Sequence, residues 1–270
     1  MNNHKQFEGF WAIILGGSSG FGFAAIEKLA QHGMNAAVLY RETAATERSL
    51  KIKFEKIAKA SNVNILALNI NALEENGRIK FLDQFKKASG GKHCVRLLMH
   101  SIARGNLKPI VAKDKHNKTA AISIQDIEFT NYAMATSLLD WTRLLFEENL
   151  FYKDARIIGL TSAGAHKYWE SYTAVSVAKA SLESLATYMA VEFGKFGLKT
   201  NLIHAGITAT PSLKKIAGSD KLVEIAKNMN PLGRITNPAD VANVIYLLCT
   251  DEAFWINGAV IHVDGGEHCR

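Results

Sequence analysis

Seven short apolar runs alternate with longer amphipathic stretches along the chain, and this alternation limits the fold more than any other feature. Apolar residues fill successive positions of each run, as in strands that helices cover on both faces of a parallel sheet. The regular order predicts a doubly wound α/β fold with about seven parallel strands, right-handed crossovers and helices on both faces. The runs lie at residues 10–16, 35–40, 64–70, 95–102, 155–162, 200–206 and 259–265.

The composition predicts one domain over residues 1–270. Apolar residues make up 48% of the chain, only four prolines are present, and no low-complexity stretch suggests a linker. No apolar run approaches the roughly 18 residues that a membrane helix requires. The first residues are polar, and a glycine cluster follows the first apolar run where a signal peptide would be cleaved. A cytoplasmic protein is therefore expected.

Charge and cysteine usage narrow the classes of partner. The formal net charge of +7 favours anions such as nucleotides or acidic proteins. The lysines are scattered and no nucleic-acid-binding motif is present, so we expect no nucleic-acid partner. Cys94, Cys249 and Cys269 are far apart and lack metal-ligand spacing, which predicts reduced thiols and no metal site. His100 and His204 lie at strand ends, and hydrogen bonds are expected to satisfy them, because no carboxylate or cysteine is spaced to join them.

A glycine cluster follows the first apolar run. The sequence LGGSSGFGFAAIEKL gives the spacing Gly16-x3-Gly20-x-Gly22 at the start of an amphipathic helix. Such a turn lets a pyrophosphate approach the unpaired N–H groups of the helix N-terminus. Its place after the first strand predicts a Rossmann-type dinucleotide site.

The end of the second apolar run bears on the cofactor. Tyr40 is followed by Arg41 and Glu42. An arginine at this place suits the 2′-phosphate of NADPH, whereas an acidic residue holds the ribose hydroxyls of NADH. Arg41, with help from Arg48, therefore predicts NADPH. The alternative is that Arg41 is only solvated and Glu42 takes the acidic role.

Taken together, these motifs resemble the short-chain dehydrogenase/reductase family over almost the whole chain. The glycine spacing matches the common nucleotide motif of that family, and INGAVIHVDGG at 256–266 matches its last strand. Tyr172 and Lys179 are separated by six residues, which is similar to the enoyl-acyl carrier protein reductases rather than to the common Tyr-x3-Lys branch. Segments 97–103 and 178–194 are similar to the same reductases.

The Tyr172-x6-Lys179 spacing suits one kind of chemistry. In the common branch, a tyrosine four residues before the lysine protonates a carbonyl beside the nicotinamide, but Val175 holds that position here. When an enoyl thioester takes a hydride at its β-carbon, negative charge gathers several bonds away on the thioester oxygen. On a helix, a step of seven returns to nearly the same face about 10 Å along the axis. The more distant Tyr172 is therefore predicted to stabilise the enolate.

The resemblance assigns further roles. Lys179 would hold the nicotinamide ribose hydroxyls and keep Tyr172 a good proton donor. Ser162 stands where many enoyl reductases carry a second tyrosine, and it either donates to the substrate oxygen or ends the fifth strand. The asparagine that the common branch uses in its fourth helix is either Asn131 or replaced at that column by Glu128. The implied cofactor-binding residues are Gly16, Ser18, Ser19, Gly20, Phe21, Gly22, Arg41, Asn69, Ile70, Ser101, Ile102, Ala103, Lys179, Gly206, Thr208 and Thr210.

The segment at about 207–232 is expected to bind the substrate. It follows the carboxyl end of the sixth strand, where open sheets bind ligands. Its apolar residues at helical spacing would form a wall for an acyl chain, and its basic residues either dock an acidic carrier protein or are merely solvated. The apolar set is Leu213, Ile216, Leu222 and Ile225, and the basic set is Lys214, Lys215 and Lys221.

The sequence thus predicts an NADPH-dependent enoyl-acyl carrier protein reductase that acts on carrier-protein or coenzyme A thioesters, with NADH the less favoured cofactor. The resemblance implies a homotetramer. One alternative is a 3-ketoacyl or other carbonyl reductase that uses Ser162 and Tyr172. Another, from a different class, is a non-catalytic NAD(P)H-binding sensor, against which the intact Tyr172/Lys179 pair argues.

Overall fold

The computed structural model describes residues 5–91, 93–112, 120–216 and 218–270. All seven expected strands are present and pair in parallel in the order β3-β2-β1-β4-β5-β6-β7. The strands are β1 (Trp11–Leu15), β2 (Asn35–Tyr40), β3 (Ile65–Asn69), β4 (Val95–His100), β5 (Phe151–Thr161), β6 (Lys199–Ala205) and β7 (Val260–Val263).

The connecting segments fold mainly as helices. The α-helices are α1 (Gly20–Gln31), α2 (Ala44–Ser61), α3 (Glu75–Ser89), α4 (Ile124–Asn131), α5 (Ser137–Glu147), α6 (Thr173–Glu192), α7 (Ser219–Met229) and α8 (Pro238–Cys249). A π-helical turn, η2 (Tyr132–Thr136), joins α4 to α5. Within the described residues, no helix combines the length and the hydropathy that crossing a bilayer would require.

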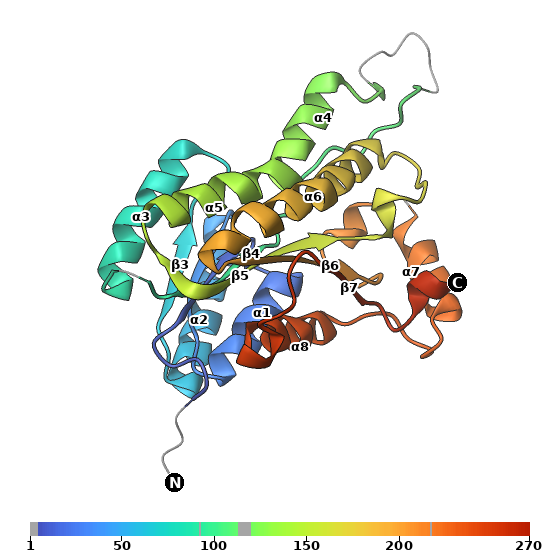
Figure 1. Cartoon of the computed structure of the whole chain (residues 1–270). Helices are drawn as coiled ribbons and strands as arrows, with labels where there is room; N and C mark the ends of the chain where they lie inside the picture. The colour runs from blue at the N-terminus through green and yellow to red at the C-terminus, as the bar shows by residue number, and fades with distance from the viewer. Residues whose placement is uncertain (1–4, 92, 113–119, 217) are drawn as a thin grey trace.

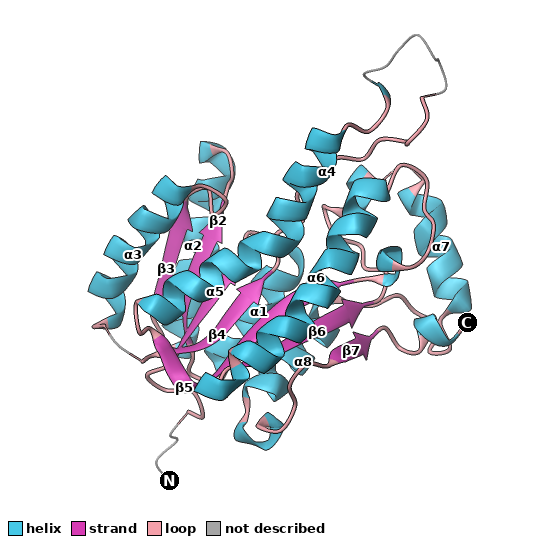
Figure 2. Cartoon of the chain, turned by 45° about the horizontal axis from the view of Figure 1, so that its top comes forward, coloured by secondary structure: helices cyan, strands magenta, loops and turns pink. Residues whose placement is uncertain are grey.

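Two helical layers sandwich the sheet (Figures 1 and 2). Helices α3, α5 and α6 pack on one face, and their apolar residues share a core with the inward side chains of β1, β4 and β5. Helices α1, α2 and α8 cover the other face with a second core. Because both faces of the central strands are buried, most of their positions hold apolar residues. The doubly wound α/β fold is confirmed.

One strand is longer than its sequence predicts. β5 starts at Phe151 rather than near residue 155, and Phe151 pairs with Val95 across a shift in register. Residues 152–154 are polar, so the first part of the strand is not part of an apolar run in the sequence.

Those polar residues include the centre of a charge cluster at the end of the sheet opposite the glycine turn. The Asp154 carboxylate lies 2.8 Å from Arg96, 2.5 Å from Arg156 and 2.5 Å from Lys199, and all three cationic side chains are buried. Arg96 and Arg156 also donate to backbone carbonyls at the end of α8. Burial alone would raise the pKa of Asp154, but hydrogen bonds from Arg156 and Lys199 outweigh it and lower the pKa to about 2. The cluster therefore fastens α8 to β4, β5 and β6.

Candidate active site

The carboxyl end of β5 positions the lysine of the Tyr-x6-Lys pair. Lys179 lies two turns into α6, and its buried ammonium donates a 2.6 Å hydrogen bond to the Leu160 carbonyl of β5. An ammonium has three donors, so two remain for other acceptors. Burial lowers the pKa of Lys179 to about 8, and the nearby Glu183 carboxylate opposes part of that shift.

Tyr172 lies directly before α6 rather than within it. Ser171 has a φ of 60°, so the helix cannot extend further back, and Tyr172 becomes its N-cap residue. Its carbonyl still accepts the first helical hydrogen bond, from the Ser176 amide. The sequence expectation that one helix carries both Tyr172 and Lys179 is therefore corrected by one residue at the N-terminus.

The Tyr172 ring packs against the turn that follows β5. A Cβ atom at Gly164 would lie 2.5 Å from the ring and 3.4 Å from Ser162 Oγ, so glycine is needed to let the ring approach. Ser162 Oγ is buried beside this ring, and it has no hydrogen-bond partner among the described residues. Burial raises the pKa of Tyr172. The structure thus brings Tyr172 and Ser162 together, and no pattern in the sequence marks Gly164.

Val175 occupies the position one turn before Lys179. It is only 5% exposed and belongs to a small apolar cluster with Ala133, Met134 and Ala178. This position therefore holds a buried apolar side chain and no hydroxyl group.

The glycine turn forms a cradle between the ends of β1 and β4. Gly16 has a φ of 89°, and a Cβ there would lie 2.6 Å from the Ser101 carbonyl oxygen. A Cβ at Gly22 would lie 2.3 Å from the Gly16 carbonyl oxygen. The Ser19 side chain does not cap α1, and no acidic residue lies in the first turn of this helix. No carboxylate of this first turn therefore competes for the N-terminus of α1, which fits the pyrophosphate of a dinucleotide.

The loop after β6 reaches this turn. The Thr210 methyl carbon would lie 3.4 Å from a Cβ at Gly20, so the two segments are in contact. The Thr210 hydroxyl accepts from the Leu213 amide at 3.2 Å, and the Thr208 hydroxyl donates to the Gly206 carbonyl at 3.0 Å. The contact brings Thr210, one of the expected cofactor residues, to the glycine turn, and Gly206 and Thr208 belong to the same loop.

The end of β2 presents Arg41 to solvent. Arg41 is exposed and forms no ion pair with the described residues, whereas the backbone of Glu42 is held by Asn69 through bonds of 3.0 Å each way. Asn69 also donates to the Glu47 carboxylate at 2.8 Å. The Asn69 side chain thus shapes the turn after β2, and Arg41 remains available for an anionic ligand.

Asn131 at the end of α4 and His100 at the end of β4 are two polar residues for which the sequence predicts a role. Asn131 ends α4 immediately before the π-helical turn, and its side-chain oxygen is buried with no hydrogen-bond partner in the described part of the chain, while Glu128 is exposed. π-helical turns inside α-helices are frequent at functional sites. His100 is buried and shares a 2.9 Å hydrogen bond with Ser137, which confirms that a hydrogen bond satisfies it. Burial, helped by the Lys179 charge, lowers the pKa of His100 to about 3, so its ring is neutral.

The expected substrate segment does not form one helix. A short 3-10 turn, η5 (Leu213–Lys215), precedes Gly218, which has a φ of 74°, and α7 starts at Ser219. The apolar spacing across this segment therefore belongs to two elements. Lys214, Lys215 and Lys221 are exposed, as predicted.

Some contacts of the site have no sequence signal. Glu183 on α6 accepts from Thr161 at 2.6 Å and lies 2.7 Å from His166 Nε2. Glu267, near the C-terminus, accepts from the Ile207 amide at 3.2 Å. These partners are distant in sequence, and single residues of this kind carry no periodic pattern.

Fold and site together define a dinucleotide-binding α/β reductase with a tyrosine and a lysine at the end of β5. A family model described as enoyl-(acyl carrier protein) reductase matches residues 16–268. The chain therefore belongs to this family, a branch of the short-chain dehydrogenases/reductases.

Individual relatives cover most of the chain at low identity. The enoyl-[acyl-carrier-protein] reductase [NADH] of Aquifex aeolicus is 29% identical over 221 residues, which are 81% of this chain and 77% of that protein. A tropinone reductase homologue of Arabidopsis thaliana is 24% identical over 97% of this chain and 91% of its own. The crystal structure of the Aquifex aeolicus enzyme superposes with a TM-score of 0.81 over 98% of each chain at 24% identity, a likeness of fold.

Proposed function

We propose that this reductase reduces the carbon–carbon double bond of a trans-2-enoyl thioester, with NADPH as the preferred cofactor, in fatty acid synthesis. The observation that carries the proposal is the position of the hydroxyl relative to the lysine. Tyr172 stands seven residues before Lys179, and the position four residues before it is the buried, apolar Val175. A carbonyl reductase of the Tyr-x3-Lys design would need its proton donor at Val175.

The residues divide the work as follows. The glycine cradle and the α1 N-terminus hold the pyrophosphate, and Lys179 directs its free donors to the nicotinamide ribose. A nicotinamide held there would supply the hydride for the β-carbon. Tyr172 donates a hydrogen bond to the thioester oxygen, where the charge of the enolate develops. The α-carbon then gains a proton that derives from solvent, so the double bond is reduced and the cofactor is oxidised.

An assay with paired thioesters tests this assignment. With NADPH, crotonyl thioester is expected to be turned over with a kcat/KM at least about 100-fold above that for acetoacetyl thioester, a difference of roughly 2.7 kcal/mol in the barrier. The reverse preference would show a ketoreductase that uses Ser162 and Tyr172. Tight NADPH binding with turnover of neither substrate would show a sensor. Either of these outcomes would overturn the proposal.

The ammonium of Lys179 predicts a loss of activity in alkali. Its pKa of about 8 means that the charge is lost well below the usual lysine range, so kcat/KM for NADPH should fall by about tenfold per pH unit once the pH is well above 8. Initial rates between pH 6.5 and 9.5 measure this. Lys179→Arg keeps its charge over this range, and any residual activity of that variant should lack the decline. A flat wild-type profile would contradict the role of the ammonium.

Arg41 predicts the choice between the two nicotinamide cofactors. In Arg41→Ala, the KM for NADPH is expected to rise roughly 10- to 100-fold, because a charged hydrogen bond is worth about 1.5–3 kcal/mol, while the KM for NADH changes little. Lys51→Ala, which removes an exposed cation of α2 that is paired with Glu47, is the matched control. Equal effects on both cofactors would count against a 2′-phosphate contact.

The substrate is proposed to enter beside the segment at 207–232. Leu213, Ile216 and Leu222 are half-buried there, which suits an acyl chain, and the exposed lysines of the segment suit an acidic carrier protein. Coenzyme A carries negative charge as well as the carrier protein. Measuring the rate with each thioester at rising salt concentration compares how strongly each substrate depends on the exposed lysines. Assembly as a homotetramer is proposed on the family resemblance alone.

A further inference from the structure

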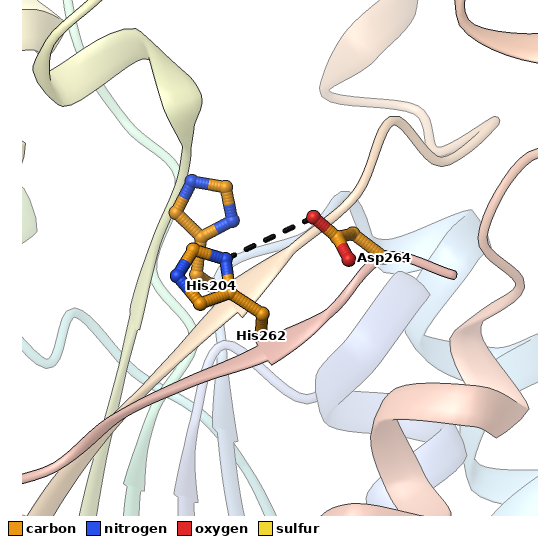
Figure 3. Close-up of side chains that lie close together, drawn as sticks. All are labelled: His204, His262 and Asp264. Atoms are coloured by element: carbon orange, nitrogen blue, oxygen red, sulfur yellow. Dashed lines mark ion pairs between the residues drawn. The ribbon is translucent and has the colours of Figure 1, made fainter. Parts of the chain in front are cut away.

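Three residues with metal-binding side chains meet at the far edge of the sheet (Figure 3). His204 in β6 and His262 in β7 are register partners in neighbouring parallel strands, so their side chains leave the same face. Asp264 follows β7 directly. The fold thus brings a carboxylate close to His204, which the spacing of residues in the sequence does not predict.

The three side chains are close enough to share one ion. One donor atom from each lies within 4.8 Å of the others. Nδ1 of His262 is 3.8 Å from Oδ2 of Asp264, and the centroids of the two imidazole rings are 4.4 Å apart. Zn²⁺ binds nitrogen and oxygen at about 2.0–2.2 Å, which places the donors of one ion about 3.5 Å apart. The His262 side chain is 37% exposed and its ring stacks on His268, so binding an ion would require a small rotation of this ring.

One ring nitrogen of His204 has no hydrogen-bond partner among the described residues. The residue is 8% exposed, and its Nδ1 atom is buried with no hydrogen-bond partner among the described residues. The expectation that hydrogen bonds satisfy His204 is therefore wrong. An unsatisfied buried polar atom costs about 1–3 kcal/mol, so its persistence calls for a ligand.

Asp264 is held in place by the C-terminal turn. Its Oδ1 accepts from the Gly266 amide at 3.0 Å, and its Oδ2 accepts from the His268 amide at 3.0 Å and from His268 Nδ1 at 2.7 Å. Such outer hydrogen bonds orient carboxylate ligands in metal sites. A hollow lined by Asn230, His262, Asp264 and His268 opens the cluster to solvent, which provides an entry path.

We propose that His204, His262 and Asp264 bind one divalent transition-metal ion and leave a further coordination position open toward this hollow. Two imidazole nitrogens and one carboxylate oxygen are a donor set for Zn²⁺ and its neighbours, whereas Ca²⁺ and Mg²⁺ prefer oxygen alone. The ion would join the ends of β6 and β7 to the C-terminal turn. It takes no part in the hydride chemistry proposed above, so the site stands or falls independently of that function.

Calorimetric titration with ZnCl₂ tests the site in the full chain, prepared without a histidine tag and freed of metal with EDTA. One equivalent is expected to bind, and Co²⁺ in its place should give the visible absorption of a low-symmetry nitrogen and oxygen site. His262→Ala should weaken Zn²⁺ binding by more than about 100-fold, because even outer-shell changes cost 10- to 100-fold. His32→Ala is the matched control, since it removes a histidine that stacks on Tyr246 instead.

The melting temperature of each metal-free variant shows whether folding is intact. If His262→Ala proves destabilised, His262→Gln keeps the bulk of the side chain and decides the question by the same titration. The absence of a one-equivalent site in the wild type, or binding that survives the loss of His262 undiminished, would overturn the proposal. So would an equal loss of binding in His32→Ala.

Discussion

Tyr172→Phe is expected to lower kcat for crotonyl thioester reduction by about 10²–10³, while the Kd for NADPH stays within about twofold of the wild type. Loss of a single donor to a developing oxyanion costs this much in other enzymes, about 2.7–4 kcal/mol. The phenylalanine ring can still pack against Gly164, so the fold and the cofactor cradle are preserved. Stopped-flow or steady-state oxidation of NADPH at saturating substrate measures the change.

Ser162→Ala supplies the matched control. Ser162 Oγ is buried beside the tyrosine but forms no hydrogen bond with it, so its loss should cost far less than the loss of the Tyr172 hydroxyl if the substrate is an enoyl thioester. The opposite order, with Ser162→Ala the more damaging change, would indicate a carbonyl reductase. Unchanged enoyl reduction in Tyr172→Phe would remove the basis of the proposed mechanism.

Asp154→Asn is expected to lower the free energy of unfolding by about 3–5 kcal/mol, the usual cost of leaving buried charges without their partner. Arg96, Arg156 and Lys199 all lose their common anion, although backbone carbonyls still accept from each. The melting temperature should fall by roughly 6–20 °C. Chemical denaturation followed by circular dichroism measures the difference.

The pH dependence of this effect has a defined sign. The pKa of Asp154 is lowered to about 2 in the folded state, so its stabilising contribution is fully present above about pH 4 and is lost as the pH falls toward 2. The gap between wild type and Asp154→Asn should therefore narrow in acid. Asp83→Asn, which breaks an exposed pair with Lys87, should cost less than about 1 kcal/mol. A comparable loss in both variants would contradict the assigned role of the cluster.

The sheet could be predicted from the sequence because burial on both faces leaves little choice of residue. β1 is a continuous apolar run, and the glycines at 16, 20 and 22 mark the turn where the backbone must approach another strand end. The start of β5 escaped prediction because residues 152–154 break the apolar pattern: Asp154 serves the charge cluster and Lys153 is exposed.

The site was predictable only where local spacing records the chemistry. Tyr172, Val175 and Lys179 lie within one short segment, so their relation can be read directly from the sequence. Tyr172 precedes the helix because the backbone of Ser171 is in the left-handed region, and serine has no strong preference for that conformation. Contacts such as that of His204 with Asp264 arise from the strand order, which places chain-distant residues side by side.

The position of the transferred hydride tests the central claim most directly. Crotonyl thioester is reduced with NADPH that carries deuterium at C4, in separate reactions for the two faces of the nicotinamide ring, and the product is examined by deuterium NMR. The account predicts butyryl thioester with deuterium at C3, the β-carbon, from one of the two labelled cofactors. Deuterium at C2 would contradict it. So would a result in which crotonyl thioester gives no labelled product, while acetoacetyl thioester in a parallel reaction gives labelled 3-hydroxyacyl thioester.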